Sequence, residues 1–197
     1  FPPHTASSSL AHALRKHYPT KDYAPHHKLA DCYFKEFESF LTITSTRNPF
    51  TRVLSHFRHV LNPKLIPRDK RKLYANGEEL GIKRMRQTAD AYILGFGQYM
   101  LKYCHDTTWI PMPVTTGFKG VTFGAVVRQE HWKKDLKSLP LPNIEDIATN
   151  YSHHKRPPLS IFGAKWQDFY EPFPELIDWV RTYYKADFEM FGYSNEL

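Results

Sequence analysis

The sequence predicts an α/β domain in which helices flank a central, mostly parallel sheet. Two short segments rich in β-branched residues, 40–44 (FLTIT) and 121–127 (VTFGAVV), have the composition of buried strands. Between them, apolar residues recur every three or four positions over 51–61 and 89–103, which indicates amphipathic helices. Because strands that alternate with helices usually pair in parallel, we expect the carboxyl ends of the strands to share one edge of the sheet.

The first part of the chain is expected to lead into this sheet. Residues 1–3 (FPP) are interpreted as the end of a strand that begins before Phe1. Apolar residues at helical spacing then predict a helix that starts at Ser7 or Ser8, where a hydroxyl side chain can cap it. A second helix is expected over 29–37, directly before the first complete strand.

The helix over 51–61 is expected to end at Pro63, because proline has no N–H and cannot continue a helix. Residues 62–88 are rich in Lys and Arg and poor in apolar side chains, which predicts an exposed excursion. The remaining expected elements, in chain order, are a helix over 89–103, a strand over 121–127, a helix over 131–139, a proline-rich loop over 140–160 and a helix over 173–184.

Composition limits the class of protein. With 41% hydrophobic and 15% aromatic residues, the 197 residues are expected to form one domain with a substantial core. The sequence shows neither a secretory signal nor the run of about eighteen apolar residues that a membrane span requires. The net charge of +7 favours phosphate, sulfate, nucleic acid or acidic glycans as partners without choosing among them, and a solvated basic surface explains it equally well. Cys32 and Cys104 have no metal-binding spacing, and we favour two buried thiols over a disulfide.

The first of two strand-to-helix turns, residues 3–10 (PHTASSSL), has the composition of an anion cradle. It combines backbone N–H groups at a helix start with several hydroxyl donors. It has no glycine and no Lys-Ser/Thr ending, so it is not a Walker loop. A capped helix with a serine-rich lead explains the same residues without any ligand.

The second turn, residues 46–55 (TRNPFTRVLS), follows the strand directly. Arg47 is at the strand end, where its forked guanidinium can bind a phosphate at two points or pair with an acidic side chain of the chain itself. Pro49 suits the first position of a helix, and Ser55 lies about two turns further along. Arg52 is expected on the surface or in an ion pair.

These two turns resemble the two signatures with which carbohydrate-type (Golgi-type and bacterial) sulfotransferases bind 3′-phosphoadenosine 5′-phosphosulfate (PAPS). Residues 128–136 (RQEHWKKDL) are similar to the family's R-x-E and D-L segment, and residues 184–194 (YKADFEMFGYS) to its closing segment. The likeness spans most of the chain in the right order. Its most specific part is 47–55, and the tail is interpreted as a feature of the fold. The resemblance implies a three-layer P-loop-like domain over residues 1–197.

In that family the first loop binds the 5′-phosphosulfate end of PAPS and the second binds the 3′-phosphate. A late basic loop, 153–156 (HHKR), is expected either to close over the nucleotide, to hold an acidic acceptor, or simply to carry surface charge. The cofactor-binding residues that the resemblance implies are His4, Thr5, Ala6, Ser7, Ser8, Ser9, Arg47, Ser55, Lys155 and Arg156.

Three histidines are candidates for the chemistry. The family's first loop usually reads Pro-Lys-Thr, and His4 occupies the position of that lysine, whose charge stabilises the leaving oxygen. A protonated His4 can do the same and a neutral one less well, so slow or acid-dependent turnover is one expected outcome. His27 matches the histidine of the family's K-H-x-x-A-like segment and is the expected general base, with His26 as the runner-up. An ordinary surface or core position is the alternative for each, and no histidine spacing indicates a metal site.

The sequence thus predicts transfer of the sulfuryl group of PAPS to a hydroxyl, with PAP as product and a glycan, acidic or neutral, as the acceptor class. One alternative is a homologue that binds the nucleotide but is catalytically impaired. Another is a basic nucleic-acid-binding protein using residues 64–86, although the standard motifs of that class are absent, so no nucleic-acid partner is expected. The compartment is expected to be the cytoplasm if the chain is near full length, or the Golgi lumen if an N-terminal anchor has been removed.

Overall fold

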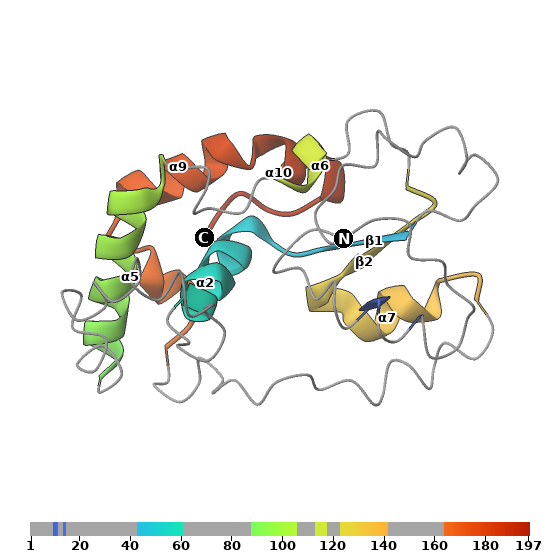
Figure 1. Cartoon of the computed structure of the whole chain (residues 1–197), viewed down its shortest axis with the longest axis horizontal. Helices are drawn as coiled ribbons and strands as arrows, with labels where there is room; N and C mark the ends of the chain where they lie inside the picture. The colour runs from blue at the N-terminus through green and yellow to red at the C-terminus, as the bar shows by residue number, and fades with distance from the viewer. Residues whose placement is uncertain are drawn as a thin grey trace, which may run out of the picture. The chain divides into compact units, whose positions relative to one another are not determined.

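The computed structural model describes Leu10, Ala11 and Leu14 together with residues 43–60, 88–105, 113–117, 123–141 and 164–197 (Figure 1). The chain divides into two compact units, and each is described by itself. The first unit consists of Phe1–Asn48, Met112–Lys155 and Ala186–Tyr193; the second consists of Pro49–Pro111, Arg156–Lys185 and Ser194–Leu197.

A pair of parallel strands, β1 (Ile43–Thr46) and β2 (Ala125–Arg128), organises the first unit. Ile43 lies opposite Ala125 and Thr46 opposite Arg128, so the carboxyl ends of both strands are level. The described residues therefore form a mixed α/β fold with parallel strand pairing, as the sequence predicts. β1 ends at Thr46, two residues beyond the expected end at Thr44, and β2 covers Ala125–Arg128 where 121–127 was expected, because strand ends depend on pairing with the partner strand as well as on local composition. Residues 40–42 of the first expected strand lie outside the described residues.

One side of this strand pair is covered by the helix α7 (Trp132–Lys137), which follows the short 3-10 turn η4 (Gln129–His131). Burying one aliphatic side chain between this helix and the strands stabilises the folded state by about 1.5–3 kcal/mol relative to leaving it exposed. The buried core consists of Leu10, Val127, Leu136 and Leu139, with Leu14, Ile43, Ala125, Trp132 and Leu141 packed against it. Leu10 and Leu14 are helical, as expected for the first helix, whose start lies outside the described residues.

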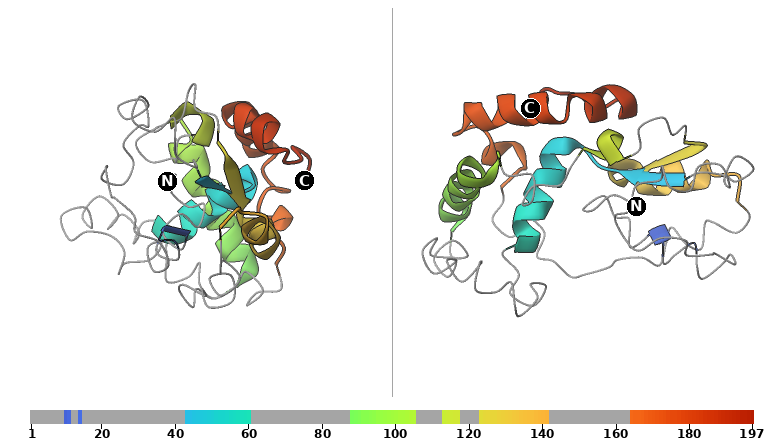
Figure 2. Two further views of the ribbon diagram at one scale, coloured as in Figure 1. Left: turned by 90° about the vertical axis from the view of Figure 1, so that its right-hand side faces the viewer. Right: turned by 45° about the horizontal axis from the view of Figure 1, so that its top comes forward.

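The opposite side of the strand pair carries α6 (Val114–Gly117) and α10 (Lys185–Phe191), as Figures 1 and 2 both show. The buried carboxylate of Asp187 in α10 accepts hydrogen bonds from the amides of Val114 and Thr115 at 2.8 and 2.9 Å. These bonds satisfy amides at the start of α6 that have no partner within that helix. A carboxylate from the tail thus holds α6 in place.

The second unit is built around aromatic side chains. Its helices are α2 (Pro49–Val60), α5 (Ala89–Tyr103) and α9 (Pro174–Tyr183), with the 3-10 turn η6 (Gln167–Phe169). Phe57 of α2 and Phe96 of α5 meet edge to face at 5.4 Å, and Phe96 meets Tyr170 in the same way at 5.1 Å. The Tyr170 hydroxyl donates to the Phe50 carbonyl at 2.8 Å, so the ring also satisfies a polar group.

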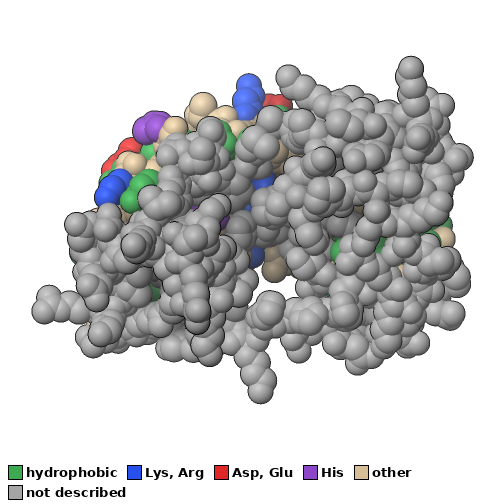
Figure 3. Space-filling model, in the orientation of Figure 1, with side chains coloured by type: hydrophobic (Ala, Val, Ile, Leu, Met, Phe, Trp, Pro, Cys, Tyr) green, Lys and Arg blue, Asp and Glu red, His purple; other side chains and the backbone are tan. Residues whose placement is uncertain are grey.

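The helix α5 has the bounds that the sequence predicts, 89–103. Its N-cap Thr88 accepts a hydrogen bond from the Ala91 amide at 3.2 Å. A Cβ at Gly97 would overlap Cζ of Phe173, so a larger residue here would force that ring to move. On the face shown in Figure 3, the visible described side chains over α5 and α9 are a mixture of apolar, positively charged and negatively charged groups.

The closing helix expected over 173–184 is observed as α9 and is followed by α10, which the sequence interpretation did not predict as a helix. Of the helices in the described ranges, none is long and apolar enough to cross a bilayer. Several expected elements lie wholly or mostly outside the described residues: the strand end at 1–3, the helix over 29–37, the excursion over 62–88 up to residue 87, and the loop over 140–160 from residue 142.

Candidate functional site

The candidate site is the edge of the strand pair at which β1 and β2 both end. Because Thr46 lies opposite Arg128, the residues that follow, Arg47 and Asn48 after β1 and Glu130 after β2, leave the sheet side by side. Ligands of parallel sheets bind beyond the carboxyl ends of the strands. This edge therefore brings the first two residues of one segment that the sequence analysis singled out, 47–55, beside the start of another, 128–136.

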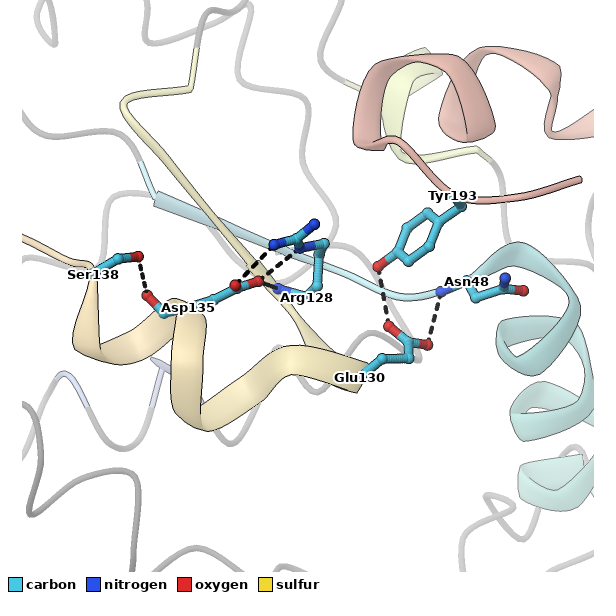
Figure 4. Close-up of polar contacts among 6 residues, drawn as sticks. All are labelled: Asn48, Arg128, Glu130, Asp135, Ser138 and Tyr193. Carbon is cyan, nitrogen blue, oxygen red and sulfur yellow. Dashed lines mark hydrogen bonds and ion pairs between the residues drawn. The ribbon is translucent and has the colours of Figure 1, made fainter.

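Glu130 connects this edge to the C-terminal tail (Figure 4). Its Oε1 accepts a hydrogen bond from the backbone amide of Asn48 at 2.9 Å, and its Oε2 accepts one from the Tyr193 hydroxyl at 3.1 Å. The two donors lie 82 and 63 residues from Glu130 in the sequence. One carboxylate thus joins three distant segments, each of which contributes to the resemblance described above.

Arg128, two residues before Glu130 in the chain, forms a two-point ion pair with Asp135. The Nε and Nη2 atoms of Arg128 donate to Oδ2 and Oδ1 of Asp135 at 2.9 and 3.0 Å, and the Arg128 amide donates to Oδ2 at 2.9 Å. Burial raises the pKa of Asp135, but the hydrogen bonds and charge of Arg128 outweigh it, so the pKa lies below its usual range. Because its guanidinium is engaged with Asp135, Arg128 serves this site as a structural residue that fixes the turn from β2 into α7.

Tyr193 is half-buried, and the pKa of its phenol is far above the usual tyrosine range. Burial is the largest cause, and the negative charge of Glu130 adds to it. The hydroxyl therefore stays protonated, and remains a hydrogen-bond donor, throughout the pH range in which the protein would work.

The structure places the two phosphate-binding candidates of the second turn in different units. Arg47, which directly follows β1, is half-buried in the first unit. Ser55 is buried in α2 of the second, with 5% of its surface exposed. The position of Arg47 is therefore described within the first unit, and that of Ser55 within the second.

The expectation that Arg52 lies on the surface is wrong. Its side chain is completely buried in the second unit, and its guanidinium carbon lies 5.7 Å from the ring centroid of Tyr184. A guanidinium over a tyrosine ring is a cation–π contact, which becomes stronger as water is excluded. Helical spacing cannot distinguish this position from an exposed one, because the aromatic residue that covers it lies far along the chain.

The other predicted site residues lie outside the described residues, so their roles stay predictions. They comprise the first-loop residues, both candidate bases and the late basic pair: His4, Thr5, Ala6, Ser7, Ser8, Ser9, His26, His27, Lys155 and Arg156. Within the described ranges, no group of three or more His, Cys, Asp or Glu side chains is placed to hold a metal ion. Cys104 is a buried free thiol, and burial raises its pKa.

The contacts that join Glu130 to Asn48 and Tyr193 were not predicted from the sequence. Both 128–136 and the tail were recognised as parts of the resemblance, but neither was assigned a place at the site. The parallel pairing offered one signal, since Glu130 follows a strand whose carboxyl end should lie beside that of 40–44. No local signal existed for Tyr193, whose position depends on how the tail packs.

Comparison of the whole chain with known proteins gives no match: no protein-family model, no curated protein and no solved structure is detectably similar to it. The function therefore has to be argued from the residues and their geometry.

Proposed function

We propose that this protein is a sulfotransferase that moves the sulfuryl group of PAPS to a hydroxyl acceptor, with a glycan as the acceptor class. The observation that carries the proposal is the meeting of three segments at one sheet edge. Asn48, Glu130 and Tyr193 come from the three stretches that resemble sulfotransferase segments, and hydrogen bonds of 2.9 and 3.1 Å join them. Segments that resemble parts of one binding fold are expected to converge in space, whereas chance resemblances are not.

The residues of the second turn have the chemistry that a phosphate requires. Arg47 offers a planar fork of N–H donors at the carboxyl end of a strand, and Ser55 offers a hydroxyl. The helix α2 begins at Pro49 with no acidic residue in its first turn, so its positive dipole end is not neutralised by its own side chains. In this proposal Arg47 and Ser55 hold the 3′-phosphate of the nucleotide.

The proposal includes the finer architecture, a three-layer P-loop-like domain. The strands β1 and β2 are parallel and adjacent, although 78 residues separate their ends and the connection contains α2, α5 and α6. A long helical crossover between parallel strands is the defining unit of such domains. The helices on both sides of the strand pair in the first unit support the same reading.

The reaction would be an in-line displacement at sulfur. The acceptor oxygen forms a bond to sulfur while the bond from sulfur to the phosphate oxygen breaks, and PAP leaves. His27, or His26 in its place, would take the proton of the acceptor hydroxyl. A protonated His4 would stabilise the charge that develops on the leaving oxygen. These three roles come from the resemblance.

The proposal is tested with the nucleotide product and with the reaction itself. We expect PAP to bind the purified chain, measured by calorimetry, and to raise its melting temperature, as any ligand specific for the native state does. ³⁵S-labelled PAPS should transfer label to a hydroxyl-bearing glycan from an acceptor panel. AMP, which lacks the 3′-phosphate, is the control and should bind much more weakly. Absence of any binding or melting shift at millimolar PAP would overturn the proposal.

A second candidate function is favoured by one residue. His4 replaces the lysine that the resemblance leads one to expect, so the protein would bind PAP yet transfer sulfate slowly. Restoring the lysine with His4→Lys distinguishes the two functions. A large rise in turnover at unchanged PAP affinity identifies the impaired homologue, whereas unchanged slow turnover means that His4 is not the limiting defect.

A further inference from the structure

We propose that Glu130 is a positioning residue for nucleotide binding, and that Tyr193 holds Glu130 in place for this role. The inference rests on the proposed function, because it concerns how the turn that carries Arg47 is shaped. Neither side chain is proposed to touch the nucleotide. Their effect on it passes through the backbone of Asn48.

The bond from Asn48 to Glu130 fixes the peptide that joins Arg47 to Asn48. A peptide group is planar, so a hydrogen bond that holds the Asn48 N–H also holds the Arg47 carbonyl and limits rotation at the Arg47 Cα. The direction in which the Arg47 side chain leaves the backbone is thereby set. At 2.9 Å the bond has the length of a well-formed one between an amide and a carboxylate.

The same bond also defines how the helix α2 begins. In a capping box, a glutamate three residues into the helix accepts a hydrogen bond from the backbone N–H of the residue that precedes the helix. The first turn of α2 has no acidic side chain to do this. Glu130, 82 residues away, accepts the bond from Asn48 instead. Asn48, the residue that precedes the helix, is therefore held by the turn that follows β2.

Tyr193 is held so that its hydroxyl reaches Glu130. The helix α10 ends at Phe191, and Gly192 follows with a φ of +67°, a conformation that glycine adopts without strain. The Tyr193 amide then bonds back to the Phe188 carbonyl at 3.1 Å, which is the long bond of a Schellman ending. Asp187 anchors the same helix to α6. The tyrosine thus points from a fixed helix end rather than from a loose terminus.

A carboxylate near an anion site opposes anion binding by its charge, and this gives the proposal a sharp test. If Glu130 acts only through its charge, Glu130→Ala should leave PAP binding unchanged or make it tighter. If Glu130 positions the Arg47 turn, the same substitution should make binding weaker. The two explanations predict effects of opposite sign.

The experiment measures the dissociation constant of PAP by calorimetry for the wild type, Glu130→Ala, Glu130→Gln, Tyr193→Phe and the double variant Glu130→Ala/Tyr193→Phe. We expect Glu130→Ala to weaken PAP binding about tenfold, because the turn that carries Arg47 must then be ordered at the moment the nucleotide binds. Glu130→Gln, whose amide oxygen still accepts the Asn48 N–H, should recover most of the loss. Tyr193→Phe should weaken binding about threefold on its own and add nothing once Glu130 is absent.

Glu171→Ala is the matched control, because it removes an exposed glutamate from the second unit. It should not weaken PAP binding. With a working acceptor, Glu130→Ala should raise KM for PAPS with kcat nearly unchanged, which a general loss of folded protein would not produce.

The inference is overturned if folded Glu130→Ala binds PAP as tightly as the wild type or tighter. If that variant does not fold, Glu130→Gln and Tyr193→Phe decide: wild-type affinity in both contradicts the positioning role. A wild type that binds no PAP is a different result, because it overturns the proposed function and this inference with it.

Discussion

Asp187 accepts two hydrogen bonds from Thr115, one from its amide at 2.9 Å and one from its hydroxyl at 2.8 Å. A third comes from the Val114 amide at 2.8 Å. The aspartate is 2% exposed, so water cannot replace it as an acceptor for these donors. It lies in a tail that the sequence interpretation assigned to the fold rather than to the chemistry.

Removing this carboxylate is expected to destabilise the protein strongly. Asp187→Ala leaves two amides and a hydroxyl without their acceptor, which costs roughly 3 kcal/mol of unfolding free energy. Urea denaturation followed by circular dichroism measures it. Asp178→Ala, at a position 78% exposed and paired with Arg181 at 3.4 Å, is the control and should change the free energy by less than about 0.5 kcal/mol. Equal stabilities of the two variants would contradict the role of Asp187.

The ion pair between Arg128 and Asp135 predicts that the unfolding free energy of the protein depends on pH in the acidic range. Because the pKa of Asp135 is lower in the folded protein than in the unfolded chain, the pair contributes stability that is fully present above the unfolded value of about 3.9. That contribution is lost as the pH falls through the lower, folded pKa. We expect the unfolding free energy of the wild type to fall more steeply below pH 4 than that of Asp135→Asn. Parallel curves from a series of denaturant titrations would argue against this pair as the source.

The phenol of Tyr193 is expected to ionise later than an ordinary tyrosine. Burial and the charge of Glu130 raise its pKa, so at about pH 10, where an exposed tyrosine is half ionised, Tyr193 should still be protonated. The absorbance difference at about 295 nm between the wild type and Tyr193→Phe should therefore appear only at higher pH. Glu130→Gln removes one of the two causes and should move this step to lower pH. An unmoved step would mean that the carboxylate does not act on the phenol.

Arg47 is expected to dominate the affinity for PAP under the proposed function. Arg47→Ala removes a charge-assisted, two-point contact and should weaken binding roughly 10- to 100-fold. Arg47→Lys keeps the charge but loses the fork, so its affinity should fall in between. Arg181→Ala, which removes a partly exposed arginine that pairs with Asp178, serves as the control for net charge. If it weakens PAP binding as much as Arg47→Ala does, the contact is not specific.

Arg52→Ala is a contrasting case, because it should affect stability more than affinity. The buried guanidinium packs over Tyr184 at 5.7 Å, and its removal leaves a cavity under the ring. We expect a loss of about 2 kcal/mol or more of unfolding free energy. Thermal melting without nucleotide measures this loss. A variant as stable as the wild type would show that the contact carries little energy.

The sequence by itself determined those features that depend on neighbouring residues. The helix over 89–103 was predicted with its bounds because its apolar periodicity is a local feature. The start of α2 at Pro49 also depends on a local feature, because proline suits the first position of a helix. The α/β class followed from the order of such elements.

Only the tertiary structure decided the features that depend on distant partners. The carboxyl end of β1 was set by its pairing with β2, in which Thr46 lies opposite Arg128, so the strand extends two residues beyond the expected end at Thr44. The helix α10 has seven residues, too few to be stable without packing, and it forms where Asp187 meets α6. The burial of Arg52 depends on Tyr184, and the bonds of Glu130 depend on donors 82 and 63 residues away. The local sequence does not predict such contacts, because they form only when residues far apart in the chain pack together.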